Sequence, residues 1–197
     1  MGAPLVSVPQ WQPLDLVVGG PWPSRLKGVL LALNVEQSPR YKPGHKLDAK
    51  GGLVPASSVT WCNVYVTDII AAMGVSAPRH WVTSSGEPAA IGKGVELSAN
   101  RLIAWFDKHG ARYGWMRSDS RTAQEAARRG HLVIVGWSNP KPALPGHVSV
   151  VLGPDRITSA GRRNFYECTV KESFGLSVDA PALRWFVQTD RPGGHGS

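Results

Sequence analysis

The sequence predicts an α+β fold in which helices precede an antiparallel β-meander. Between residues 24 and 129, apolar residues recur at helical spacing, and glycines follow several of these runs. After Gly130 the pattern changes to short apolar runs that are typical of buried strands. Gly153-Pro154-Asp155 separates two such runs as a turn would, so the flanking strands should pair antiparallel. A parallel doubly wound sheet would instead alternate strands and helices along the chain.

Four helices are expected from their end signals. They span 25–33, a run from Cys62 to Gly74, 99–109 and 122–129. Ser24 and Ser98 are suitable N-cap residues for the first and third of them. Gly74 follows the Cys62 run as a C′ glycine would, and Gly110 ends the third helix. Cys62 should therefore lie on the first turn of a buried helix.

The strands of the meander are expected at 132–137, 147–152, 156–160 and 183–188. Residues 37–58 contain prolines, glycines and lysines and are expected to form a long loop. A structureless loop of ~20 residues inside a domain is unusual and often functional. Because this loop leads directly into Cys62, we expect it to form one wall of a cleft.

Chain length fits one domain with an extension, since the sequence has 197 residues. Hydrophobic residues make up 42% of the chain and charged residues 18%, which indicates an ordinary globular protein. We expect an N-terminal extension with one helix packed on the body (1–39), a main domain (40–190) and a flexible tail (191–197).

The net charge of +8 predicts an anionic partner, such as nucleic acid, an anionic envelope or an acidic polymer. Arg128-Arg129 and Arg162-Arg163 are the only adjacent basic pairs, and a nucleic-acid surface needs a clustered stripe, so nucleic acid is disfavoured. No apolar run approaches the ~20 residues of a membrane span. Residues 1–20 lack the pattern of a Sec signal. We therefore expect synthesis in the cytoplasm and, for action in the periplasm or cell wall, delivery by another route.

Cys62 is the first candidate for chemistry. At a helix start, free amide N–H groups and the helix dipole favour a thiolate, which lowers the thiol pKa and produces a nucleophile. The alternative interpretation is a small buried hydrophobic residue, as most free cysteines are. The other cysteine, Cys168, does not make a disulfide scaffold with it, and two free thiols are expected.

His147 is the second candidate, because it opens a strand directly after Pro145-Gly146 and so lies beside a loop. Histidine is the usual base and general acid next to a thiolate. Each of the other histidines is better explained as structural or solvated: His45, His80, His109, His131 and His195. No metal-binding spacing and no phosphate-binding loop occurs, so neither a metal nor a cofactor is expected.

Two segments carry a resemblance to a known family. The run from Thr60 to Asp68 resembles the nucleophile segment of papain-like cysteine hydrolases of the NlpC-type and CHAP (cysteine, histidine-dependent amidohydrolase/peptidase) group. The run from Pro145 to Val151 resembles the histidine strand of that group. The resemblance covers roughly residues 40–175. It implies a papain-like fold with the catalytic cysteine at a helix start, packed on a small antiparallel sheet, and cleavage of amide bonds, most often in peptidoglycan.

The same resemblance implies a third polar residue that orients the imidazole. The family usually has His, Gln, Asn or Glu there, whereas the matching position in this chain is Ser159. A serine hydroxyl can accept the Nδ1–H bond but does not stabilise imidazolium as a carboxylate would. Asn164 and Glu167 are the alternatives. The expected substrate-binding residues are Trp61, Asn63, Trp81, Trp137 and Asn164, although the tryptophans are more often core residues.

Three functions compete. The first is a peptidoglycan amidase or endopeptidase, such as a phage endolysin or an antibacterial effector, which acts on peptidoglycan or another amide polymer and admits an immunity or inhibitor protein as a partner. The second is a papain-like protease or acyltransferase that acts on proteins inside cells. The third is a non-enzymatic basic domain in which Cys62 is a core residue.

Overall fold

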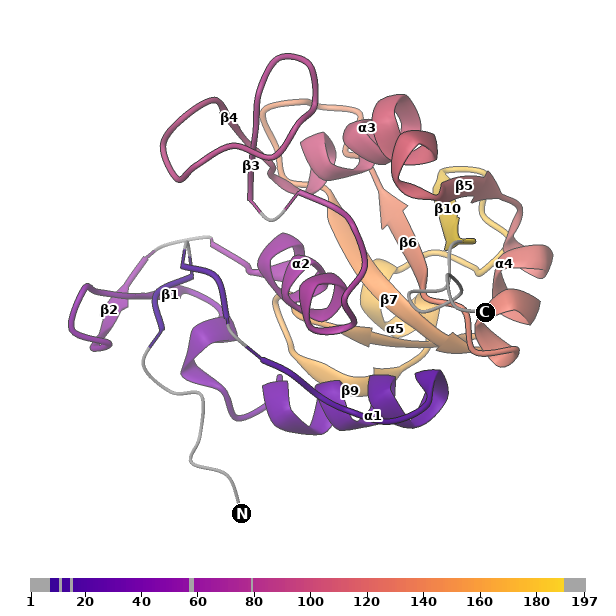
Figure 1. Cartoon of the computed structure of the whole chain (residues 1–197), viewed down its shortest axis with the longest axis horizontal. Helices are drawn as coiled ribbons and strands as arrows, with labels where there is room; N and C mark the ends of the chain where they lie inside the picture. Colours follow the sequence, from indigo (N-terminus) through magenta and orange to yellow (C-terminus); the bar gives the residue numbers. More distant parts are fainter. Residues whose placement is uncertain (1–7, 11, 15, 57–58, 79, 190–197) are drawn as a thin grey trace, which may run out of the picture.

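The computed structural model describes residues 8–10, 12–14, 16–56, 59–78 and 80–189 (Figure 1). Its main sheet has six strands in the order β5-β10-β6-β7-β8-β9, and all neighbours pair antiparallel. The strands span Trp115–Ser118 (β5), Val133–Trp137 (β6), His147–Gly153 (β7), Arg156–Ser159 (β8), Phe165–Cys168 (β9) and Leu183–Gln188 (β10). The expected α+β class with an antiparallel sheet is confirmed. The tail expected at 191–197 lies outside the described residues.

In the described part of the chain, five α-helices cover the two faces of this sheet. They span Trp22–Leu33 (α1), Cys62–Ala72 (α2), Ala99–His109 (α3), Ser120–Arg128 (α4) and Val170–Phe174 (α5), and a 3₁₀ turn, Gly110–Tyr113, follows α3. Side chains of α1, α2 and α3 share one hydrophobic cluster, and those of α4 and α5 share the other. Figure 1 shows α2 in front of the sheet and α5 behind it. Among the described residues, no helix combines the length and the apolarity that crossing a membrane requires.

Strand β7 separates the two clusters. Val148 and Val150 belong to the cluster of α2, whereas Val151 belongs to the cluster of α4 and α5. Successive strand residues point to opposite faces, and a strand that is buried on both faces reads as a continuous apolar run. This is why the run after His147 is apolar at nearly every position. On β6, Trp137 is the residue opposite His147.

The local end signals placed several helices correctly. Helices α2 and α3 begin at the expected residues, and Gly74 after α2 has φ +72°, which only glycine adopts easily. Helix α1 begins earlier than expected, at Trp22, because a proline is well tolerated in the first turn. Helix α4 also begins earlier, because Asp119 is its N-cap and accepts from the N–H of Thr122 at 2.8 Å.

The expectation of a structureless loop at 37–58 was wrong. The segment contains a 3₁₀ turn, Pro39–Tyr41, and a hairpin made of β1 (His45–Leu47) and β2 (Leu53–Pro55). A second small hairpin, which the sequence did not indicate, pairs β3 (Trp81–Val82) with β4 (Val95–Glu96). The edge strands β5 and β9 and the short helix α5 were also not anticipated. These elements are too short to show a period of their own.

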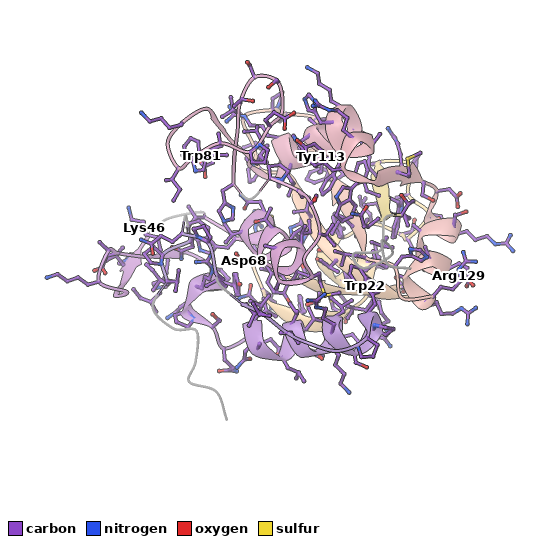
Figure 2. All side chains as sticks on the ribbon, in the orientation of Figure 1. Trp22, Lys46, Asp68, Trp81, Tyr113 and Arg129 are labelled. Atoms are coloured by element: carbon purple, nitrogen blue, oxygen red, sulfur yellow. The ribbon has the colours of Figure 1, made fainter. Side chains whose placement is uncertain are left out.

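Arg40 joins the N-terminal segment to the body of the protein. Its fully buried guanidinium donates to both carboxylate oxygens of Asp68 on α2, at 2.8 and 3.1 Å. It also donates to four main-chain carbonyl groups near the N-terminus: Val8, Pro9, Gln10 and Gln12. Figure 2 shows Asp68 in the interior of the molecule. A buried charge needs such compensation, so the carbonyl groups of residues 8–10 and 12 complete the interior around α2.

Candidate active site

Cys62 is the first residue of α2, and both of its neighbours in sequence hold a small hairpin in place. The indole Nε1 of Trp61 donates to the carbonyl oxygen of His45 on β1 at 2.8 Å. The amide Nδ2 of Asn63 donates to the carbonyl oxygen of Leu97, directly after β4, at 2.8 Å. Figure 1 shows both hairpins at the left of the view, next to α2. Trp61 and Asn63, which were expected to bind substrate, thus use their polar groups to hold the hairpins beside the cysteine.

Cys62 is buried, with only 2% of the residue exposed. Burial raises its pKa above the ordinary value, and this effect outweighs the lowering caused by hydrogen bonds from the main chain of Val148, Asn63 and Cys62 itself and from the Thr60 side chain. The expected lowering of the thiol pKa is therefore wrong for this conformation. The helix start does favour the thiolate, but the loss of solvent has the greater influence, and the resting residue is a neutral thiol.

His147 opens β7 as expected, and its imidazole is held at Nε2. This nitrogen lies 2.9 Å from the hydroxyl oxygen of Ser159 on β8 and 2.9 Å from that of Ser173 on α5. The ring of Phe174 meets the imidazole edge-on, with the centroids 4.7 Å apart. Ser159 is thus the partner of His147, as the resemblance implied, but it contacts Nε2 and not Nδ1.

The other nitrogen, Nδ1, has no hydrogen bond to any described residue. In the described residues, the one side-chain N or O atom that is both fully buried and without a hydrogen bond is Oε1 of Gln188, so Nδ1 is not fully buried. Nδ1 therefore borders solvent. Burial of the ring lowers the pKa of His147 to about 4. At neutral pH the imidazole is neutral and one of its nitrogens is open to a reactant.

Cys62 and His147 both lie at the beginning of β7, but no hydrogen bond joins them. The thiol adjoins the main chain of Val148, and His147 is the preceding residue. The imidazole leans toward α5, whereas the thiol lies on the α2 side of the strand. The structure thus brings His147 and Ser159 into contact, and it brings Cys62 next to the main chain of β7 but not into hydrogen-bond contact with the imidazole.

Asn164, one of the expected site residues, is committed to the main chain. Its Nδ2 donates to the carbonyl oxygens of Val35 and Tyr41, both at 2.9 Å, and its Oδ1 accepts from the N–H of Gly161 at 3.1 Å. Its amide therefore holds the loop after β8 in place. Glu167 lies in an exposed ion pair with Arg156 at 3.6 Å. The imidazole is therefore contacted by Ser159, whereas Asn164 and Glu167 do not reach it.

Two tryptophans complete the expected set. Trp137 is half-buried, lies opposite His147 on β6 and packs on the cluster of α4 and α5. Trp81 is half-buried on β3, in the hairpin that Asn63 holds (Figure 2). Ser173, Phe174 and Ser149 are contacts of His147 that the sequence did not indicate. The only local signal near Ser173 is the capping box of Thr169 and Glu172, which predicts a short helix but not what that helix touches.

The other histidines of the described residues and Cys168 lie outside this cluster of contacts. His80 is buried with Nδ1 3.2 Å from the Thr67 hydroxyl, and His131 Nδ1 lies 3.0 Å from the carbonyl oxygen of Gln188. Cys168 is a buried free thiol in the cluster of α4 and α5, and Cys62 is a free thiol in the other cluster. In the described ranges, no group of three or more His, Cys, Asp or Glu residues is arranged to hold a metal ion.

No family model matches this chain, and no curated protein was found to be similar to it. The likeness of the Cys62 and His147 segments to NlpC-type and CHAP hydrolases is therefore a likeness of two short motifs.

Proposed function

We propose that this protein is a cysteine-dependent amidohydrolase that cleaves amide bonds of peptidoglycan, with Cys62 as the nucleophile and His147 as the base and acid. One observation carries the proposal. The thiol at the start of the central helix adjoins the residue that follows His147, and the imidazole of His147 is anchored at Nε2 and open at Nδ1. A nucleophile, a base and a group that orients the base are the minimum set for covalent acyl transfer.

The reaction would begin from a neutral pair. As Sγ of Cys62 forms a bond with the substrate carbonyl carbon, Nδ1 of His147 takes the thiol proton and the carbonyl oxygen becomes an oxyanion. The imidazolium then gives that proton to the leaving amine as the C–N bond breaks and a thioester remains. Water attacks the thioester with Nδ1 again as the base, which releases the acid and restores the thiol. In the structure the imidazole faces α5 and the thiol lies on the α2 side of β7, so the imidazole must turn to within ~3 Å of the thiol when substrate binds.

The oxyanion would be stabilised at the start of α2. The first N–H groups of a helix have no partner within the helix and point out of its N-terminus. In α2 the first N–H that bonds back to the preceding turn is that of Tyr65, which donates to the carbonyl oxygen of Trp61 at 2.9 Å. The N–H groups of Cys62 and Asn63 therefore remain for the sulfur and for the oxyanion that forms on it.

Peptidoglycan is the substrate that best fits the charge. The protein carries a net charge of +8, and bacterial cell walls are anionic, so the wall attracts it at long range. A cationic enzyme on an anionic polymer should depend strongly on salt, because exposed charges are screened over ~8 Å at physiological ionic strength. We therefore expect the rate on intact wall to fall with added salt.

A second candidate function follows from the burial of the thiol. A cysteine that is 2% exposed and has a raised pKa matches a small hydrophobic core residue of a basic, non-enzymatic binding domain. The two candidates differ in one respect that can be measured: whether removal of the thiol or of the imidazole abolishes a reaction.

The test is digestion of purified sacculi, with new amino groups and soluble fragments as the readout. Wild type, Cys62→Ala, His147→Ala and Cys168→Ala are compared, and Cys168→Ala is the matched control because it removes a buried free thiol from the other cluster. We expect wild type and Cys168→Ala to release fragments and the other two variants to release none. Equal release by Cys62→Ala would refute the proposal, and no release by any folded variant would favour the binding domain.

A further inference from the structure

Three serine hydroxyl groups surround one nitrogen of His147. They come from β7 (Ser149), β8 (Ser159) and α5 (Ser173). Nε2, Ser159 Oγ and Ser173 Oγ form a triangle in which every side is 2.9 Å. Ser149 Oγ donates to Ser159 Oγ at 3.0 Å and lies 3.4 Å from Nε2. Ser149 and Ser159 are 0% and 1% exposed, so this cluster is almost wholly interior.

The hydrogens of the cluster can be assigned. Ser149 donates to Ser159, so the oxygen of Ser159 already accepts one hydrogen bond. If Ser159 donates to Ser173, the oxygens of both residues can accept from an N–H on Nε2. The hydroxyl hydrogen of Ser173 then points outward, which the half-buried position of this residue allows. Every buried hydrogen has an acceptor in this arrangement, and it places the imidazole proton on Nε2.

The opposite tautomer satisfies the serine cluster as well, but it does not suit the proposed reaction. With the proton on Nδ1, a hydroxyl group would donate to Nε2 and the Nδ1–H would be left to solvent, since no described residue accepts from it. The same tautomer would also occupy the nitrogen that must take the proton of Cys62 in the proposed reaction. The serine cluster can accept the hydrogen bond from Nε2–H, and the proposed reaction requires the proton on that nitrogen.

We propose that Ser173 is a second positioning residue of His147, which shares with Ser159 the hydrogen bond from Nε2–H and thereby keeps the lone pair of Nδ1 free toward the substrate. The family resemblance provides one residue on the neighbouring strand for this task. Here two hydroxyl groups on different elements share it, and α5 becomes part of the site. This inference rests on the proposed function for its catalytic meaning, but its structural content can be tested without any substrate.

Helix α5 is held firmly enough for this role. Thr169 and Glu172 form a reciprocal capping box at its start. The N–H of Val170, whose side chain is fully buried, donates to Oδ1 of Asp155 at 3.2 Å. On the far side of Ser173, the ring of Phe174 lies against the imidazole. Ser173 is thus fixed on both sides, and its hydroxyl has a defined position relative to Nε2.

The first test is ¹⁵N NMR of the imidazole in the full chain. Wild type is compared with Ser173→Ala, Ser159→Ala, the double variant and Ser177→Ala, an exposed serine just after α5 that serves as the matched control. We expect the Nε2–H tautomer in wild type and Ser177→Ala, and a measurable fraction of the Nδ1–H tautomer once Ser173 is removed. A wild-type spectrum of the Nδ1–H tautomer, or an unchanged spectrum in Ser173→Ala, would overturn the inference.

The second test is kinetic. Loss of one such hydrogen bond should lower kcat about tenfold with little change in KM. Ser173→Thr, which keeps a hydroxyl group, should restore most of the rate. If Ser173 were merely structural, its removal would not lower kcat selectively and leave KM unchanged. If kcat in Ser173→Ala equals that of Ser177→Ala, the positioning role is wrong. If His147→Ala keeps full activity, the proposed function fails instead, and the NMR result still decides the tautomer.

Discussion

Acid should destabilise this protein through His147. The imidazole has a pKa of about 4 in the fold, whereas a solvated histidine titrates near ~6.5. The folded state therefore binds fewer protons than the unfolded state between these two values. The stability that the neutral, buried ring contributes is fully present above pH ~6.5, and it is lost progressively as the pH falls toward 4.

The magnitude follows from the two pKa values. Each unit of difference corresponds to about 1.4 kcal/mol, and at pH 4.5 nearly the whole interval has been crossed. The free energy of unfolding should therefore be about 2.5 kcal/mol lower at pH 4.5 than above pH 7 from this residue alone. Because solvent reaches Nδ1, this figure is an upper value. Within the described part of the chain, the ring contacts three serines and Phe174, so no neighbouring charge there opposes the effect.

The assay is urea unfolding of wild type and His147→Gln at pH 7.5 and 4.5. Other titrating groups are common to both proteins, so the difference between the two pH dependences isolates His147. We expect the unfolding free energy of wild type to fall by up to about 2.5 kcal/mol more than that of the variant. Parallel losses in both proteins would show that the ring is hydrated and titrates normally, and the inference of a neutral starting pair would fail with it.

Three further predictions concern the scaffold of the site. Arg40→Met should lower the free energy of unfolding by about 3–5 kcal/mol, because it leaves a buried carboxylate without its partner, whereas Arg112→Met, at an exposed ion pair, should have a far smaller effect in the same urea assay. Tyr65→Phe removes a buried 2.7 Å hydrogen bond to Thr158 and should cost about 1 kcal/mol by thermal unfolding. Gly161→Ala would place a methyl group 3.2 Å from Cε1 of the imidazole, so it should shift the ring resonances and lower sacculus digestion more than stability.

The parts of the fold that the sequence predicted are those with local signals. Helices α2 and α3 have clear starts, and the turn at Asp155, with φ +49°, joins β7 to β8 as expected. Strand β5 has no such signal, and among the described strands it pairs with β10 alone, where Ser118 lies opposite Trp185. A pairing between segments so distant in sequence depends on the whole fold. The hairpins beside Cys62 were taken for loop for a different reason, because their strands have only two or three residues and show no period.

In the candidate site too, contacts with a local signal could be predicted from the sequence and the others could not. The contact between His147 and Ser159 was predictable, since the two residues lie on neighbouring strands joined by a short turn and a hairpin fixes which residues come together. Ser173 reaches the same nitrogen from a helix beyond the next strand. No spacing rule relates its position to that of His147, so only the tertiary structure identifies it.

The thiol pKa was mispredicted for a physical reason. A helix start stabilises a nearby negative charge by at most about 2 kcal/mol in partly buried positions. Full burial can raise the pKa of an acid by several units, which is the stronger effect. The sequence reveals that Cys62 begins a helix but not how deeply that helix is buried. Because burial also lowers the pKa of His147, both groups are neutral at rest, and charge would develop only when the substrate carbonyl receives the sulfur. A neutral resting pair makes the orientation of the imidazole by Ser159 and Ser173 more important than it would be for a pair already held together by opposite charges.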